Sequence, residues 1–190
     1  MLSARWRIFA PLALAAAGLS ACSGPGDLPA LPPVPTGQYI LGPGDQVRII
    51  TFGAEQLTGQ FKVGDSGDIA LPLLGNVHAA GLTSQQLSQE LTTGLVRTGM
   101  FKSPSVAVEV AAYRPIFVLG EVTKPGQYPY QPGMTVLTAI AIAGGFTYRA
   151  VTDSFSVVRT VAGGKTIEGI ANRQTTLQPG DVITVYERHF

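Results

Sequence analysis

Short runs in which hydrophobic and polar residues alternate recur along this chain, and they predict β-strands. The clearest is residues 103–113 (SPSVAVEVAAY), in which three valines alternate with Ala107 and Glu109. Runs rich in Val, Ile and Phe between Gly and Pro predict the other strands. They lie at residues 47–52, 61–77, 116–122, 154–160 and 165–170, and within 177–188. Residues 61–77 are predicted to form a hairpin turned at residues 65–68, and Pro72 confines its second strand to an edge or an end of the sheet. The runs at 154–160 and 165–170 are predicted to form a second hairpin, turned at Gly163 and Gly164.

Two segments have helical patterns. In residues 81–99, Thr83 and Gln86 have the spacing of a capping box, which predicts a helix start. Leu82 and Leu87 form the hydrophobic staple around it, and leucines then recur every four residues as one apolar stripe that predicts packing on a sheet. Residues 136–143 (VLTAIAIA), capped by Thr135, predict a shorter helix that is apolar on all sides and therefore buried.

One turn sequence occurs twice: LGPGD at residues 41–45 and LQPGD at 177–181, each followed by a run of Val and Ile. Proline at the second position and glycine at the third predict a type II turn. A third turn of this type is predicted at Pro125 and Gly126. The predicted turn residues are Pro43, Gly44, Asp45, Pro125, Gly126, Pro179, Gly180 and Asp181. Each repeated turn opens a strand, one in each of two small β-rich modules at residues 38–112 and 113–190.

The first 21 residues have the pattern of a signal peptide. Two arginines precede an uncharged stretch at residues 8–21, which is too short to span a membrane readily as a permanent helix. It ends in LSAC, which resembles a bacterial lipobox, and Cys22 is the one cysteine of the chain. We expect Cys22 to carry the lipid anchor. By resemblance to bacterial lipoproteins, Ser23 favours sorting to the outer membrane, facing the periplasm.

Residues 22–37 are expected to form the anchor and a spacer. The sequence SGPGDLPALPPVPTG is rich in Pro and Gly and shows no periodicity. Proline-rich linkers are extended and semi-rigid. This segment would hold the folded modules away from the lipid surface.

Composition and charge narrow the function. Gly (23) and Pro (14) are abundant and only 13% of residues are charged, which favours many turns between short strands. Two of the 13 Lys and Arg residues lie in the leader, which leaves 11 against 12 Asp and Glu residues and a net charge of −1. Without a basic patch, nucleic acid is not an expected partner.

Two stretches together resemble a known family. Residues 67–91 (GDIALPLLGNVHAAGLTSQQLSQEL) resemble the polysaccharide export domain of outer-membrane polysaccharide export lipoproteins of the Wza and GumB type. Residues 116–147 (IFVLGEVTKPGQYPYQPGMTVLTAIAIAGGFT) resemble the SLBB domain, a β-grasp fold that follows it in that family. The resemblance covers residues 38–190 in the family's domain order and implies an α+β fold.

The resemblance also implies a function. Such a protein would form a homo-oligomeric ring in the export of capsular polysaccharide or exopolysaccharide, with polysaccharide as cargo and an inner-membrane copolymerase as partner. Larger family members carry more SLBB repeats and a C-terminal amphipathic helix, neither of which is expected here. The chain would then belong to the short class and form a lipid-held collar, and another component, such as a separate β-barrel protein, would complete passage through the outer membrane.

Catalysis is not expected. His78 and His189 lie in no metal-binding pattern, and no nucleophile elbow or phosphate-binding loop is present. Asp65 and Asp68 are interpreted as turn residues and not as a calcium loop, because a later glutamate is missing. No metal or cofactor is therefore predicted.

Aromatic and arginine side chains are the candidates for contact with glycan or with another subunit, because such residues dominate interface hot spots. Packing within the sheets is the alternative for each of them. A periplasmic lipoprotein that binds a small ligand or a glycan also remains open as a function. The candidates are Tyr113, Arg114, Tyr128, Tyr130, Tyr148 and Arg149.

Overall fold

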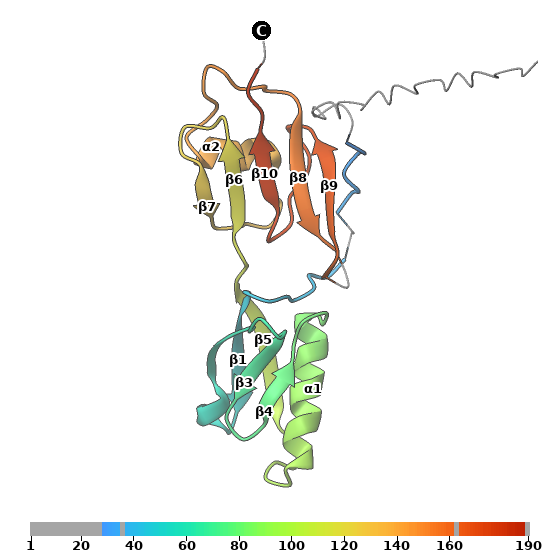
Figure 1. The fold of residues 1–190 in the computed structure, drawn as a ribbon. Coiled ribbons are helices and arrows are strands. Elements are labelled where there is room, and N and C mark those ends of the chain that lie inside the picture. Colours follow the sequence, from blue (N-terminus) through green and yellow to red (C-terminus); the bar gives the residue numbers. More distant parts are fainter. Residues whose placement is uncertain (1–27, 35–36, 162–163, 189–190) are drawn as a thin grey trace, which may run out of the picture.

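The computed structural model describes residues 28–34, 37–161 and 164–188. The predicted signal peptide, Cys22, Gly163 and His189 lie outside these residues. The chain folds into two modules stacked end to end, each with its own buried core (Figure 1). Both modules mix strands with one α-helix, so the predicted α+β class is confirmed.

The first module contains a three-stranded antiparallel sheet and a separate two-stranded hairpin. The sheet has the order β2-β1-β5, and the hairpin pairs β3 with β4. One α-helix, α1, packs beside β5 (Figure 1). The bounds are β1 Gln46–Phe52, 3-10 helix η2 Glu55–Leu57, β2 Gly59–Lys62, β3 Asp68–Leu71, β4 Gly75–His78, α1 Ser84–Arg97 and β5 Ser105–Ala112.

Helix α1 forms as its sequence predicts. The Gln86 amide donates to the Thr83 hydroxyl, and the Thr83 amide donates to the Gln86 side chain, which completes the capping box. The leucine stripe, Leu87, Leu91 and Leu95, is buried. The first two of these leucines join the core that lies beneath β1.

The second module contains a mixed five-stranded sheet in the order β7-β6-β10-β8-β9. The last strand, β10, lies in the middle, parallel to β6 and antiparallel to β8. This arrangement of two hairpins around a central closing strand, with a helix across one face, is a β-grasp fold. The bounds are β6 Ile116–Gly120, β7 Gly126–Tyr128, α2 Val136–Ile142, β8 Phe155–Thr160, β9 Thr166–Ala171 and β10 Val182–Val185.

The hairpin predicted within residues 61–77 is wrong. A turn does form at residues 64–68, but β2 pairs with β1 and β3 pairs with β4. The chain after β2 does not fold back to pair with β2, because the backbone of Val63 is hydrogen-bonded to Gly44 and Asp45 of the LGPGD turn. The real hairpin turns beyond Leu71, where Pro72 ends β3, so the expectation that Pro72 limits this strand is confirmed.

The type II turn predicted at Pro125 and Gly126 is also wrong. Gly126 is the first residue of β7 and pairs with Val118, and its φ angle is not positive. Gly120 takes the positive φ instead, at 83°. It must be glycine, because a Cβ there would overlap the carbonyl of Val185 on the neighbouring strand β10.

Two further expectations need correction. Helix α2 is not buried on all sides: Val136, Ala139 and Ile140 face the core, whereas Leu137 and Ile142 are exposed. The helix covers one face of the sheet, and its outer side is partly open to solvent. The Pro-rich segment is also not a spacer throughout, since residues 29–32 bind along β9.

Candidate functional site

The first LGPGD turn closes around a buried carboxylate. The Asp45 amide donates to the Gly42 carbonyl at 3.1 Å, and Gly44 has a φ of 94°. The Asp45 side chain is completely buried and its Oδ2 accepts from the Gly42 amide at 2.8 Å and from the Tyr39 hydroxyl at 2.6 Å. A buried carboxylate needs such donors, because burying an unpaired charge is costly.

The second copy, LQPGD, has the same construction in the other module. The Asp181 amide donates to the Gln178 carbonyl at 3.1 Å, and Gly180 has a φ of 87°. Asp181 Oδ2 accepts from the Gln178 amide at 2.8 Å. In both turns, therefore, the aspartate carboxylate binds the amide three residues before it and lies buried in its module.

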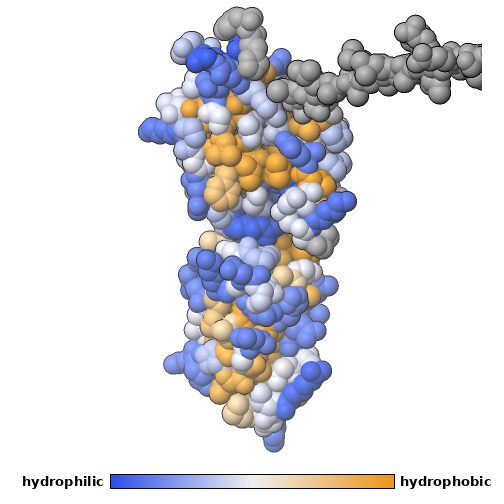
Figure 2. All heavy atoms as spheres, viewed as in Figure 1, coloured by the Kyte–Doolittle hydropathy of each residue, from blue (hydrophilic) through white to orange (hydrophobic). Residues whose placement is uncertain are grey.

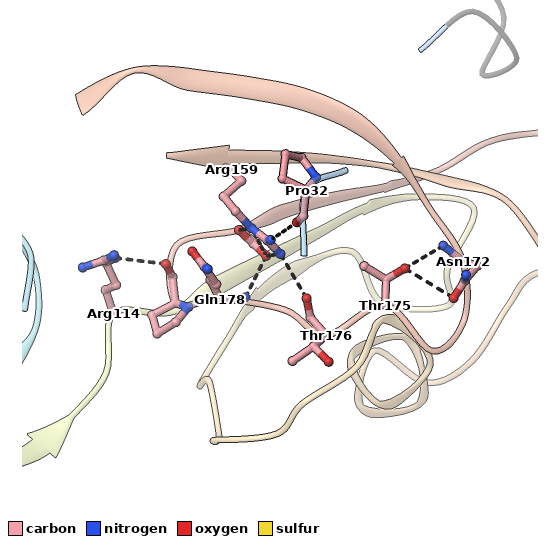
Figure 3. Close-up of polar contacts among 9 residues, drawn as sticks. Pro32, Arg114, Arg159, Asn172, Thr175, Thr176 and Gln178 are labelled. Carbon is pink, nitrogen blue, oxygen red and sulfur yellow. Dashed lines mark hydrogen bonds and ion pairs between the residues drawn. The ribbon is translucent and has the colours of Figure 1, made fainter. Parts of the chain in front are cut away.

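Arg159 on β8 neutralises the second carboxylate. Its Nη2 lies 2.7 Å from Asp181 Oδ2 and its Nε lies 3.0 Å from Oδ1, a two-pronged ion pair. Its remaining N–H groups donate to the carbonyls of Thr176 and Pro32 (Figure 3). Arg159 thereby ties together β8, the second turn and the segment that precedes the first module.

Arg114 joins the two repeated turns to each other. Its backbone amide donates to Asp45 Oδ1 at 2.8 Å, and its Nη1 donates to Asp45 Oδ2 at 3.2 Å. Its Nε donates to the Pro179 carbonyl of the second turn at 3.0 Å (Figure 3). The sequence repeat thus has a structural reason, because the two copies meet at one arginine between the modules.

The glycines of both turns leave room for this arginine. A Cβ on Gly42 would overlap the Arg114 guanidinium, and a Cβ on Gly180 would lie 3.1 Å from Arg114 Nε. Real Cβ contacts are rarely so short, so a side chain at either position would displace the arginine. The turn glycines therefore have two uses: a left-handed backbone at Gly44 and Gly180, and close approach at Gly42 and Gly180.

A row of three tyrosines continues the contact between the modules. The rings of Tyr39 and Tyr113 meet edge to face with centroids 4.9 Å apart, and those of Tyr113 and Tyr130 do so at 5.4 Å. Each such pair contributes about 0.5 to 1.5 kcal/mol beyond the area it buries. Since Tyr39 belongs to the first module and Tyr130 to the second, the row stabilises their contact.

Burial changes the titration of this cluster. Burial raises the pKa of the Tyr39 hydroxyl well above its ordinary value, and the hydrogen bond to Asp45 raises it further. Burial also raises the pKa of Tyr130. The pKa of Asp181 is raised by burial, although the hydrogen bond from Arg159 opposes the rise. The hydroxyl groups of Tyr39 and Tyr130 therefore stay protonated at physiological pH.

The structure brings three of the six predicted contact residues together and separates the others. Tyr113, Arg114 and Tyr130 form the junction. Tyr128 donates its hydroxyl to the Lys124 carbonyl in its own module. Tyr148 has 90% of its surface exposed.

Arg149 forms an ion pair with Glu187. Of the six, Tyr148 is thus the side chain most open to a partner. A role for any of them in binding glycan or another subunit stays a prediction.

Sequence reasoning missed Tyr39 and Arg159. The signal for Arg159 was present, because a charged residue in the otherwise apolar strand SFSVVRT requires a buried partner. Its partner Asp181 was recognised only as a turn residue. Nothing in the local sequence of Tyr39 indicated that its hydroxyl reaches Asp45.

The described part of the chain shows no site for metal chemistry. In residues 28–34, 37–161 and 164–188, no three His, Cys, Asp or Glu side chains are grouped as metal ligands would be. The pair formed by His78 and Asp68, 2.8 Å apart, is exposed. Within the same residues, no helix is both long and apolar enough to cross a membrane.

Comparison with known proteins agrees with the two-module architecture. The family model described as polysaccharide biosynthesis/export protein matches residues 33–111, and the SLBB domain model matches residues 115–171. This chain belongs to the polysaccharide export family. Arg114 lies between the two matched segments, so the arginine that joins the turns also lies where the export domain gives way to the SLBB domain.

Several curated proteins share 32% identity with this chain. They include the exopolysaccharide production protein ExoF of Rhizobium meliloti, aligned over 74% of this chain and 36% of that protein. The EPS I polysaccharide export outer membrane protein EpsA of Ralstonia nicotianae aligns over 81% of this chain and 42% of that protein. The polysialic acid transport protein KpsD of Escherichia coli aligns over 56% of this chain and 19% of that protein. The chain spans less than half the length of these relatives.

Proposed function

We propose that this protein is a lipid-anchored component of a complex that exports capsular polysaccharide or exopolysaccharide. It is held at the outer membrane by Cys22 and faces the periplasm. Several copies form a ring through which the polysaccharide passes, next to an inner-membrane copolymerase. The role is one of transport and not of catalysis.

The observation that carries this proposal is the export domain followed by the SLBB domain, joined at Arg114 into one unit. Both family models match in that order, and the relatives are named for exopolysaccharide production, polysaccharide export and polysialic acid transport. EpsA is also named an outer membrane protein. Buried charges and tyrosines at the junction fix the two domains against each other. A subunit that forms part of the wall of a conduit needs its domains to be fixed in this way.

One surface of the SLBB domain suits contact between copies. Helix α2 covers one face of the sheet, and the opposite face carries Phe117 and Leu119, which are 37% and 43% exposed. Phe117 pairs with Val182 of β10, which in turn pairs with Val158 of β8, so the apolar side chains form a row. Figure 2 shows hydrophobic residues gathered across the visible face of the upper module. Exposed apolar patches of this kind mark interaction sites.

The ring is tested by mass photometry of the lipidated protein in native membrane extracts. We expect a closed oligomer, and we expect Phe117→Glu combined with Leu119→Glu to reduce it to monomers. The matched control is Phe52→Glu, which changes an exposed aromatic residue of the export domain. A strict monomer at all concentrations would remove the ring from the proposal.

Export itself is tested by deleting the gene. Surface polysaccharide should disappear while its lipid-linked precursors are still made. Normal surface polysaccharide in the deletion strain, together with saturable binding of a small ligand by the monomer, would instead favour a ligand-binding lipoprotein. The hollow lined by Asp153, Asn172, Arg173 and Gln174 is open to solvent, which gives that alternative little support.

A further inference from the structure

The sheet of the SLBB domain has a hydrophobic centre on the face that α2 does not cover. One row of paired residues crosses all five strands, and its members in spatial order are Gln127, Phe117, Val182, Val158 and Glu168. Successive residues of a strand point to opposite faces, and Val118 and Val157 belong to the core beneath α2. The row therefore lies on the other face, apolar in its middle and polar at both ends, as in the buried centre and polar rim of an interface.

The outer side of α2 carries a second hydrophobic surface. With about 3.6 residues per turn, Leu137, Ala141 and Ile142 lie on one side of the helix. Leu137 and Ile142 are 45% and 44% exposed, which is as open as the side chains on the opposite face of the sheet. In Figure 1 α2 lies behind β6 and β10, and Figure 2 shows hydrophobic residues across the face turned to the viewer.

We use two names for these surfaces. The sheet patch consists of Phe117, Leu119, Val158 and Val182, and the helix patch consists of Leu137, Ala141 and Ile142.

The sequence of α2 is more hydrophobic than its place in one chain requires. Of the seven residues VLTAIAI, only Thr138 is polar. A helix that is hydrophobic on all sides is normally buried on all sides. Within the described chain the sheet covers one side only, formed by Val136, Ala139 and Ile140. The composition of the helix therefore indicates that a second surface covers the helix patch.

The charges around the two patches are complementary. Glu168 lies at one end of the row that contains the sheet patch. Lys124 lies at the end of α2, where its amide donates to the carbonyl of the C-cap residue at 2.9 Å. Arg173 lies at the start of the helix, but Asp153 lines the same hollow, so the complementarity rests on Lys124. Opposite charges at the rims of two surfaces favour their association.

We propose that the sheet patch of each copy packs against the helix patch of the next copy. This inference rests on the proposed ring and names the two surfaces that meet in it. A two-fold dimer would bury the same patch twice and leave the other patch in water. A head-to-tail contact joins unlike patches, and closure of the ring covers both patches of every copy. Each α2 then lies between its own sheet and the sheet of its neighbour.

Two variants of the lipidated full chain, purified in detergent, test this contact by native mass spectrometry. The sheet variant carries Phe117→Glu and Leu119→Glu, and the helix variant carries Leu137→Glu and Ile142→Glu. Each variant alone should have a monomer fraction roughly tenfold larger than that of the unchanged chain. An equimolar mixture should form dimers with one copy of each variant and should grow no further. Each such dimer joins the intact helix patch of one variant to the intact sheet patch of the other.

Other compositions would contradict the head-to-tail contact. Dimers of either variant alone would indicate a two-fold contact between like patches. A helix variant that still forms rings would show that α2 lies outside the interface. Either result would overturn the proposal.

The matched control combines Val96→Glu with Met100→Glu. These residues of the export domain are 46% and 59% exposed, so the control adds the same charge to side chains that are equally open. It should leave the ring intact. Equal loss of rings in the control and in the helix variant would show that the effect is not specific to the helix patch, and the proposal would fall.

Cross-linking tests the same contact without adding charge to either patch. One chain carries Val158→Cys in the sheet patch, another carries Leu137→Cys in the helix patch, and both are produced in one cell. Cys22 carries lipid in this material and does not react. A short bifunctional thiol reagent should join the two kinds of chain, with about one-tenth as much product when either chain is produced alone. This arm remains decisive if a glutamate variant fails to fold.

The results separate failure of the ring from failure of this contact. If the unchanged chain is a monomer at every concentration, the ring and the contact are both wrong. If rings form but the sheet and helix cysteines do not cross-link, this contact is wrong and the ring stands. Export is tested independently by deletion of the gene.

Discussion

Tyr39 and Asp45 share a hydrogen bond of 2.6 Å in which the tyrosine must keep its proton. At the scale of single residues, this bond and the guanidinium of Arg114 satisfy a carboxylate that water does not reach. Asp181, which is also buried, is satisfied by its ion pair with Arg159. The two repeated turns therefore use one construction, an aspartate that binds its own turn and an arginine, in two different surroundings.

The raised pKa of Tyr39 predicts sensitivity to alkali. Because folding raises this pKa above its ordinary value of 10.0, the folded state favours the neutral hydroxyl. Its contribution to stability is complete below pH 10 and is lost as the pH rises through that value and beyond. Denaturant titrations should show the free energy of unfolding falling steeply above about pH 10.

Tyr39→Phe provides the control for this prediction. The variant should be less stable at neutral pH, because Asp45 loses a donor, but its stability should decline less steeply in alkali. An identical alkaline slope in both proteins would contradict the assignment to Tyr39. The absorbance of tyrosinate should also show that the intact chain has tyrosines that ionise late.

At the scale of elements, the hairpin of β3 and β4 contains an unusual residue. Leu73 has a φ of 66° and is the one residue other than glycine with a positive φ among those the structure describes. It follows Pro72 and is 49% exposed. A left-handed backbone brings the Cβ of an L-residue close to the following carbonyl oxygen, at a cost of roughly 1 to 2 kcal/mol.

Leu73→Gly should therefore stabilise the export domain. We expect an increase of about 0.5 to 1 kcal/mol in the free energy of unfolding, since relief of the backbone exceeds the entropy cost of glycine. The matched control is Asn76→Gly, an exposed position inside β4, which should lose stability. Denaturant unfolding measures both. A loss of stability in Leu73→Gly equal to that of the control would show that this turn is not strained.

At the scale of the whole molecule, two hydrophobic cores are coupled through a small polar and aromatic junction. Separate sets of buried residues fill the export and SLBB domains. Between them, Arg114 supplies donors to both repeated turns, and Tyr113 contacts a tyrosine on each side. The relative position of the domains thus depends on very few side chains.

Arg114→Ala should uncouple the domains. Removing one partner of a buried ion pair is strongly destabilising, and we expect a loss of about 3 kcal/mol because Asp45 retains other donors. Calorimetry should resolve separate transitions for the two domains in this variant. Arg149→Ala, which breaks the exposed pair with Glu187, should change stability by less than about 1 kcal/mol. Equal effects of the two substitutions would contradict the assigned role of Arg114.

Much of the fold was predictable because its signals are local. Capping by Thr83 and Gln86, leucines every four residues and valines every second residue depend only on nearby sequence, and each prediction is confirmed. The turn sequences at residues 41–45 and 177–181 contain the proline and glycine that their geometry needs. The order of the two domains also follows from the linear order of these patterns.

Only the tertiary structure decided which elements meet. Local patterns mark strands without stating their partners, so the pairing of β3 with β4 and the insertion of β10 between β6 and β8 were not foreseen. Arg114 reaches Asp45 across 69 residues of sequence, and Arg159 reaches Pro32 across 127. Such contacts form because buried charges and unpaired strand edges must be satisfied from whatever part of the chain arrives there. Hence the sequence by itself determined the elements and their order, and folding alone determined the junction and the contact of residues 29–32 with β9.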